Sequence, residues 1–236
     1  LAMLEDPLKL EIMGFDEIGA KIAASFGNEL KDSRYLRRFP DFVESLKKAH
    51  QSGDPTVKIK RISSEDATNQ NPRYQIGIAS LDYPGLMTVI SGACFKGRLD
   101  AKRVYAYTNS EFCLALDFLE VSAEKNIDEL GILRRNLEVS IKNKTFIDDD
   151  PKAILTVLDR RVTLEDLINS SNQLRLSFQT NKNEKGVLYA LSRTLYEKIG
   201  ANIYGVKAFV DENITTIVSL PQLFSRVSWL CHGTQY

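Results

Sequence analysis

The chain of 236 residues is poor in the side chains that most catalytic and metal sites require. It holds only two histidines, His50 and His232, and three cysteines. The cysteines, Cys94, Cys113 and Cys231, show no CxxC spacing, which disfavours a disulfide framework and fits a reducing compartment. Cys231 and His232 are adjacent, and two neighbouring ligands cannot by themselves form a tetrahedral metal site. We therefore expect no metal, no cofactor and a cytoplasmic protein.

The chain also lacks an excess of charge of either sign and a long apolar run. Lys plus Arg and Asp plus Glu number 31 each, so the formal net charge is zero. Domains that bind nucleic acid through bulk electrostatics need a positive field, so we expect no nucleic-acid partner. No apolar run approaches the ~18 residues that a membrane-spanning helix needs, so we expect no membrane partner.

What the chain does contain is a repeated local pattern. Two segments each show an alternating strand, then a turn of Asx and Gly residues, then an amphipathic helix that ends near a glycine. The glycines that mark the two turns, Gly85 and Gly186, lie 101 positions apart. A duplication of this kind predicts two similar small units in tandem.

The periodicity of apolar residues predicts the same order of elements in both units. The first unit is expected to hold strands at 73–80, 101–108 and 112–121, helices at 84–96 and through 127–141, a shorter helix from about Pro151, and a closing strand at 161–164. The second is expected to hold strands at 173–180, 202–210 and 214–220, a helix through 188–199, and a final helix from Pro221.

This order predicts an α+β protein with two tandem ferredoxin-like (βαββαβ) units after a helical segment. The boundaries are placed at 1–56 for the helical N-terminal segment and linker, 57–168 for the first unit with a preceding strand and loop, and 169–236 for the second. Each unit leaves one face of its sheet bare. The two units are expected to cover each other or to join edge to edge into one wider sheet.

The two turns carry the chemistry that the sequence offers. Asp82 lies where a helix N-cap belongs, and Gly85 leaves the backbone open to a ligand atom. The free N–H groups at a helix start favour a carboxylate, and Asp82 is a partner for an ammonium group. Gly85 and Leu86 are therefore candidate N–H donors for a small amino acid. The alternative is that both turns are ordinary helix starts.

The residues of the first turn lead to a family resemblance. Asp82-Tyr-Pro-Gly-Leu-Met followed by Ile90-Ser-Gly-Ala resembles the opening of an ACT domain, a small module that senses amino acids. The wider pattern, about residues 30 to 230, is similar to the C-terminal region of bacterial PII uridylyltransferases, which carries two ACT domains. The resemblance implies a regulatory module with glutamine as the ligand. The candidate ligand-binding residues are Asp82, Tyr83, Pro84, Gly85, Leu86 and Met87 in the first turn, and Asn183, Glu184, Lys185, Gly186 and Val187 in the second.

The departures from that family are informative. The second turn has Asn183 in place of Asp and Lys185 in place of Pro, and a neutral Asn cannot balance a ligand ammonium. The Gly-Ser turn with paired carboxylates of the family's transferase part is missing, and neither histidine is followed by Asp as its hydrolase part requires. We therefore expect a chain that is not itself an enzyme and that acts on the catalytic domains of a longer parent.

Three other functions compete with the ligand sensor. One is a ligand-free module that pairs as a homodimer through its sheet edges. Another is an RNA-binding module, in which Tyr105 and Tyr107 would form a stacking face, although the aromatic signature of that class is missing. An enzyme is the least favoured, because the sequence shows no catalytic triad, phosphate loop or metal cluster.

Overall fold

The computed structural model describes residues 16–26, 39, 41–62, 72–123, 130–146, 162–166, 173–180, 186–199, 205–210 and 214–221. The helices are α2 (Glu17–Ser25), α3 (Phe42–Ser52), α4 (Leu86–Lys96), α5 (Leu130–Lys142) and α7 (Val187–Thr194), which continues as the π-helix η4 (Leu195–Ile199). The strands are β1 (Thr56–Ile62), β2 (Arg73–Leu81), β3 (Leu99–Asn109), β4 (Leu114–Ala123), β5 (Val162–Asp166), β6 (Gln173–Thr180), β7 (Gly205–Val210) and β8 (Ile214–Pro221).

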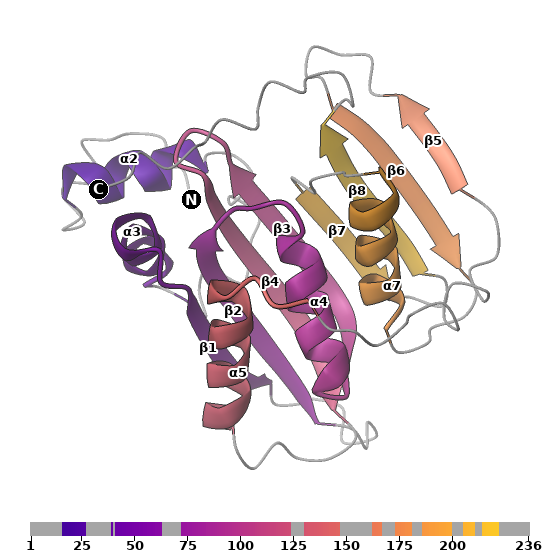
Figure 1. Ribbon diagram of the computed structural model, residues 1–236, viewed down its shortest axis with the longest axis horizontal. Helices are drawn as coiled ribbons and strands as arrows, with labels where there is room; N and C mark the ends of the chain where they lie inside the picture. The colour runs from indigo at the N-terminus through magenta and orange to yellow at the C-terminus, as the bar shows by residue number, and fades with distance from the viewer. Residues whose placement is uncertain are drawn as a thin grey trace.

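The strands form one antiparallel sheet in the order β1-β2-β4-β3-β7-β8-β6-β5 (Figure 1). The predicted α+β class is therefore confirmed. The sheet has two halves of four strands, and β3 pairs with β7 from Arg103↔Phe209 to Tyr107↔Gly205 to join them. Of the two arrangements that the sequence allowed, the chain adopts the edge-to-edge one.

One predicted strand belongs to the other half of the sheet. The segment at 161–164 was expected to close the first unit, but β5 pairs with β6 and so opens the second half. The matching edge of the first half is β1, which pairs with β2. In both halves the edge strand pairs with the strand that follows it in the chain, because an antiparallel neighbour needs only a short connection. The prediction that this strand closes the first unit was therefore wrong.

Two expected helices cannot be compared with the structure. The helix from about Pro151 lies outside the described residues, and so does the final helix after its first residue. That first residue, Pro221, is instead the last residue of β8, where it pairs with Gln173.

Helices cover both faces of the first half of the sheet. On one face α4 packs between α5 and α7, and on the other face α3 packs on β2 and β4 with α2 beside it (Figure 1). Strand β4 lies between these layers and is buried along its whole length. The N-terminal helices therefore supply the cover that the bare face of the first unit needed.

The packing against the N-terminal helices depends on one glycine of β2. A Cβ built at Gly77 would lie 3.0 Å from the ring of Phe39, which is itself 3% exposed. The Phe39 ring also meets the Phe118 ring of β4 with 5.9 Å between centroids. A glycine inside a strand often marks such a close approach. Here it lets an aromatic ring rest directly on the sheet.

Candidate functional site

The two repeated turns have the same backbone. Gly85 has φ 87° and ψ 3°, and Gly186 has φ 87° and ψ 1°. Each glycine is the N-cap of the helix that follows, α4 or α7, and neither helix start has a side-chain cap. The prediction that Asp82 is the N-cap was wrong. The left-handed conformation of Gly85 starts the helix three residues later, and this conformation favours glycine over residues with a Cβ.

Backbone hydrogen bonds hold the first turn together and fix it to Cys113, the residue just before β4 begins. The N–H of Asp82 donates to the carbonyl of Cys113 at 2.8 Å, and the N–H of Leu86 donates to the carbonyl of Tyr83 at 3.1 Å. The Leu86 N–H is therefore already used within the turn. The donor role predicted for Leu86 would require this bond to break.

The space above Gly85 is filled by two aromatic rings of the chain itself. A Cβ built at Gly85 would lie 2.9 Å from the ring of Phe146 and 3.2 Å from the ring of Tyr196. These two rings stack on each other with 5.2 Å between centroids and 10° between planes. The close approach that the glycine permits is thus made by Phe146, which follows α5, and by Tyr196 of η4 in the second half.

Tyr83 ties the turn to α5. Its hydroxyl donates to the carbonyl of Ile141 at 3.0 Å, and the Lys144 ammonium lies 5.0 Å from its ring centroid. The pKa of Tyr83 is raised by burial and by the nearby carboxylates of Asp117 and Asp82. This tyrosine is therefore a neutral structural anchor.

A buried carboxyl group lies on the strand beneath this turn. Asp117 of β4 is 2% exposed, and its Oδ2 has no hydrogen-bond partner within the described part of the chain. Its register partners are Ile78 on β2 and Ala106 on β3. Burial raises the pKa of Asp117 well above the usual range, and the charge of Asp82 adds to the rise. Ser80 of β2, which is 1% exposed, also has a hydroxyl without a partner in that part.

The two helices that begin at these turns pack against each other. The hydroxyls of Ser91 on α4 and Ser192 on α7 lie 2.9 Å apart, and these serines are 101 positions apart, as the glycines are. Near the other end, Phe95 of α4 stacks on Tyr189 of α7 with 5.7 Å between ring centroids. Because the end of α4 meets the start of α7 and Ser91 meets its counterpart Ser192, the helices run in opposite directions, and the contact relates the two halves by an approximate twofold axis.

The remaining predicted site residues divide into two groups. Leu86, Met87 and Val187 are buried and Pro84 is half-buried, so they form the packed start of their helices. Asn183, Glu184 and Lys185 lie outside the described residues. The structure therefore brings Asp82, Tyr83 and Gly85 together with three residues that the sequence did not predict, namely Asp117, Phe146 and Tyr196.

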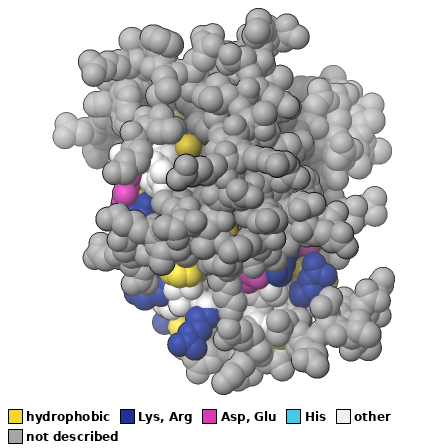
Figure 2. All heavy atoms as spheres, turned by 90° about the vertical axis from the view of Figure 1, so that its right-hand side faces the viewer, with side chains coloured by type: hydrophobic (Ala, Val, Ile, Leu, Met, Phe, Trp, Pro, Cys, Tyr) yellow, Lys and Arg dark blue, Asp and Glu magenta, His cyan; other side chains and the backbone are white. Residues whose placement is uncertain are grey.

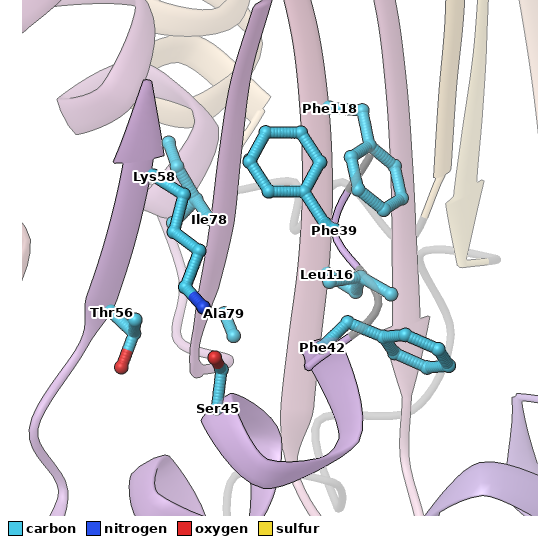
Figure 3. A pocket seen from close by; sticks show the side chains of 10 residues that line it. Phe39, Phe42, Ser45, Thr56, Lys58, Ile78, Ala79, Leu116 and Phe118 are labelled. Carbon is cyan, nitrogen blue, oxygen red and sulfur yellow. The ribbon is translucent and has the colours of Figure 1, made fainter. Parts of the chain in front are cut away.

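The opposite face of the sheet holds a cavity that is too small for a ligand. It lies between α3 and the sheet, where the rings of Phe39 and Phe118 face each other and Lys58 reaches toward Ser45 (Figure 3). Its volume of about 10 Å³ barely accommodates one water molecule. This cavity is a packing gap beside the hydroxyl of Thr56, which is buried without a partner in the described part.

The tyrosines considered for RNA stacking belong to this same packed layer. Tyr107 is 6% exposed and lies in the core formed with α2 and α3, and Tyr105 packs against that core. Both lie on β3 where it pairs with β7. These two tyrosines therefore pack in or against the core and do not form an exposed stacking face. On the end of the molecule seen in Figure 2, the Lys and Arg side chains form separate groups among the side chains described.

Comparisons with known proteins do not extend this description. No protein-family model matches the chain, and no curated protein matches it significantly. None of the helices in the described ranges is long and apolar enough to cross a membrane. In the same ranges, no group of three or more His, Cys, Asp or Glu is placed to hold a metal ion.

Asp117 is the residue of the site that sequence reasoning overlooked, although the sequence holds a signal for it. It interrupts the apolar positions Ala115, Leu119 and Val121 on one face of a strongly apolar strand. A carboxyl at an inward-facing position is rare without a partner. Phe146 and Tyr196 carry no comparable signal, because an aromatic residue after a helix is common.

Proposed function

We propose that this chain is a regulatory module made of two ACT-type ferredoxin-like units, and that it binds a small amino acid at the start of α4. Glutamine is the amino acid that the family resemblance implies. The proposal includes a cytoplasmic location, control of the catalytic domains of a longer parent, and no catalysis by the chain itself.

The observation that carries the proposal is the contact between the two halves at the first turn. One of the two rings over Gly85 comes from Tyr196, which belongs to the other half of the sheet. A ligand that takes the place of this ring would contact α4 directly and would shift the end of α7. A regulatory ligand must prefer one of two arrangements, and the α4–α7 contact provides a place where two arrangements can differ.

The charge and exposure of the surrounding groups fit an amino acid. Asp82 is half-buried, and its charge acts on the buried carboxyl of Asp117. Carboxyl groups are strong hydrogen-bonding partners for an ammonium group. The other ring over the turn, that of Phe146, is 39% exposed. Its displacement would open one side of the space above Gly85, at the cost of exposing the buried part of the ring.

A ligand-free module that dimerises through its sheet edges is less well supported. The outer edge of the first half is β1, which carries Lys58, Lys60 and Arg61. Lysines on an edge strand oppose the addition of another strand. Lys58 also forms an ion pair with Asp41.

The test is calorimetric titration of the chain with each of the twenty amino acids, together with the variants Gly85→Val and Gly186→Val. Both variants place a β-branched residue at φ 87°, so their intrinsic backbone strain is matched. We expect one amino acid to bind, and we expect only Gly85→Val to abolish binding. Absence of binding, or equal binding in both variants, would contradict the proposal. A denaturation curve for each variant verifies that it is folded.

A further inference from the structure

The pairing of the strands shows which residue of the second half corresponds to Asp117. The segment Tyr74–Ala79 of β2 matches 174–179 of β6 in the repeat. Ile78 pairs with Asp117, and its counterpart Phe178 pairs with Thr216. Thr216 therefore occupies the register position of Asp117.

The turns differ in the same way. Asp82 lies 101 positions before Asn183, the spacing that also relates the two glycines. The first half thus has two carboxyl residues, Asp82 and Asp117, at positions where the second half has Asn183 and Thr216. The two turns share a backbone conformation, but only the first half has carboxyl groups at these two positions.

A buried carboxyl with an unpartnered oxygen is unfavourable unless it is neutralised. Asp117 lies between apolar register partners, and its Oδ2 has no hydrogen-bond partner among the described groups. Two means of neutralisation are available, a bound proton or a cationic group with its own N–H donors. The eleven-residue helix α4 begins just above, and the half-buried Asp82 interacts electrostatically with Asp117. The two carboxyl groups are therefore close enough for the charge of Asp82 to act on the buried group.

We propose that Asp117 binds the ammonium group of the ligand from beneath the first turn, with Asp82 as the outer partner, and that each chain has only this one cation-binding turn. This inference rests on the proposed function and adds to it the anchoring residue, the charge class of the ligand and the stoichiometry. The proposal includes a proton on the buried carboxyl of Asp117 before the ligand binds. When the ammonium group arrives, that proton leaves to the solvent, and the resulting carboxylate accepts an N–H hydrogen bond.

Few other groups can supply or take up this proton. The charge that acts on Asp117 is that of Asp82. Two neighbours on α5 are engaged elsewhere: Lys142 bonds Asp54 at 2.6 Å, and Glu138 accepts the Val57 N–H at 3.3 Å. The remaining titratable or charged residues on the elements around Asp117 are Tyr83 in the turn, Arg73 and Tyr74 on β2, Asp100, Lys102, Arg103, Tyr105 and Tyr107 on β3, Glu120 on β4, Cys94 and Lys96 on α4, Arg134 and Arg135 on α5, and Lys144 beside Tyr83. Glu120 lies 3.8 Å from Arg73 and 3.6 Å from Arg103, so its charge is balanced. Asp100 and Lys102 pair with each other at 2.6 Å, and burial raises the pKa of the Cys94 thiol to about 12.

The first experiment measures proton release. The chain is titrated with L-glutamine by calorimetry in two buffers of different ionisation enthalpy, at several values between about pH 5 and pH 8. We expect release of about one proton per bound ligand where Asp117 is protonated in the free protein. Asp117→Asn, which resembles the neutral acid in shape, should fold normally, release no proton and bind about tenfold or more weakly. The control Thr216→Val, at the matching position of the second half, should bind as the unchanged chain does.

The second experiment observes the carboxyl directly. In protein with ¹³C-labelled aspartate, the Asp117 carboxyl signal is assigned by its loss in Asp117→Asn. Glutamine and methylammonium should both shift this signal to the ionised form, and 4-carbamoylbutanoate, which lacks the amino group, should not. If glutamine binds but leaves the signal and the affinity of Asp117→Asn unchanged, this inference fails and the proposed function stands. If no amino acid binds while methylammonium ionises Asp117, the cation site stands and the proposed function fails. If neither probe binds, both fail.

Discussion

The two turns of this chain share a backbone and differ in chemistry. Gly85 and Gly186 adopt the same left-handed conformation, start helices that pack together, and lie 101 positions apart. Only the first turn has Asp82 and the buried Asp117, whereas the second half has Asn183 and Thr216 at those positions. The comparison teaches that two turns can share a backbone geometry without sharing a set of charges, because a glycine suffices for the turn.

The largest effect should come from closing the first turn. Gly85→Val adds a β-branched residue at φ 87° and brings its Cβ to 2.9 Å from the Phe146 ring. We expect a loss of about 2–4 kcal/mol in the free energy of unfolding, from backbone strain and overpacking together. Urea denaturation measures it. Gly186→Val should lose about 1–3 kcal/mol from strain. A smaller loss in Gly85→Val than in Gly186→Val would show that the rings do not pack on the first turn as described.

The second effect is a pH dependence of the free energy of unfolding that Asp117, in the first half of the sheet, should produce. Burial raises the folded-state pKa of Asp117 well above its ordinary value, so the folded protein binds more protons than the unfolded chain between these two pKa values. Stability from this group is complete below the unfolded pKa and is lost as the pH rises toward the folded one, by about 1.4 kcal/mol per unit of separation.

Asp117→Asn removes this titration, so its stability relative to the unchanged chain should increase as the pH rises above about 4. Urea denaturation at a series of pH values measures the difference. Asp54→Asn is a control of opposite sign. A hydrogen bond from Lys142 lowers the pKa of Asp54, so its stabilising effect is present at neutral pH and is lost in acid. An Asp117→Asn difference that does not change with pH would show that Asp117 titrates normally.

The third effect tests whether Ser91 and Ser192 stabilise the protein by interacting with each other across the α4–α7 contact. Ser91→Ala and Ser192→Ala each remove one hydroxyl of the buried pair at 2.9 Å. Each should lower the free energy of unfolding by about 1 kcal/mol, and the double variant should lose less than the sum. A double-mutant cycle measures the coupling. Strictly additive losses would indicate that the two hydroxyls act only through their own helices, since each also bonds a carbonyl there.

The smallest effect concerns the ring above the first turn. Phe146→Ala removes a 39% exposed ring that occupies the place of the ligand. We expect the affinity for the amino acid to rise about threefold, which is ~0.6 kcal/mol, with little change in stability. Calorimetric titration measures it. A weaker affinity would show that the ring contributes to the ligand site and does not compete with the ligand.

Much of the fold could be predicted from particular segments. Alternating apolar residues located β2 at 73–80 and β6 at 173–180, close to or at the observed bounds, and the apolar stripe of Leu86 to Cys94 located α4. The pairing of β5 with β6 could not be predicted, because a strand's pattern shows which face is buried and not which neighbour it joins. The candidate site was predicted through Asp82, Tyr83 and Gly85. Asp117, Phe146 and Tyr196 were missed, because they reach the turn from other parts of the chain.

The sequence by itself determined the repeated strand-turn-helix pattern, the glycine at each turn and the difference in acidity between the two turns, since all three are local. Tertiary structure decided the rest. It joined the halves through β3 and β7, covered the free face of the first half with α2 and α3, and buried the carboxyl of Asp117 where the charge of Asp82 acts on it. These outcomes depend on which buried surfaces meet, and that choice is made by packing over the whole chain rather than by any local pattern.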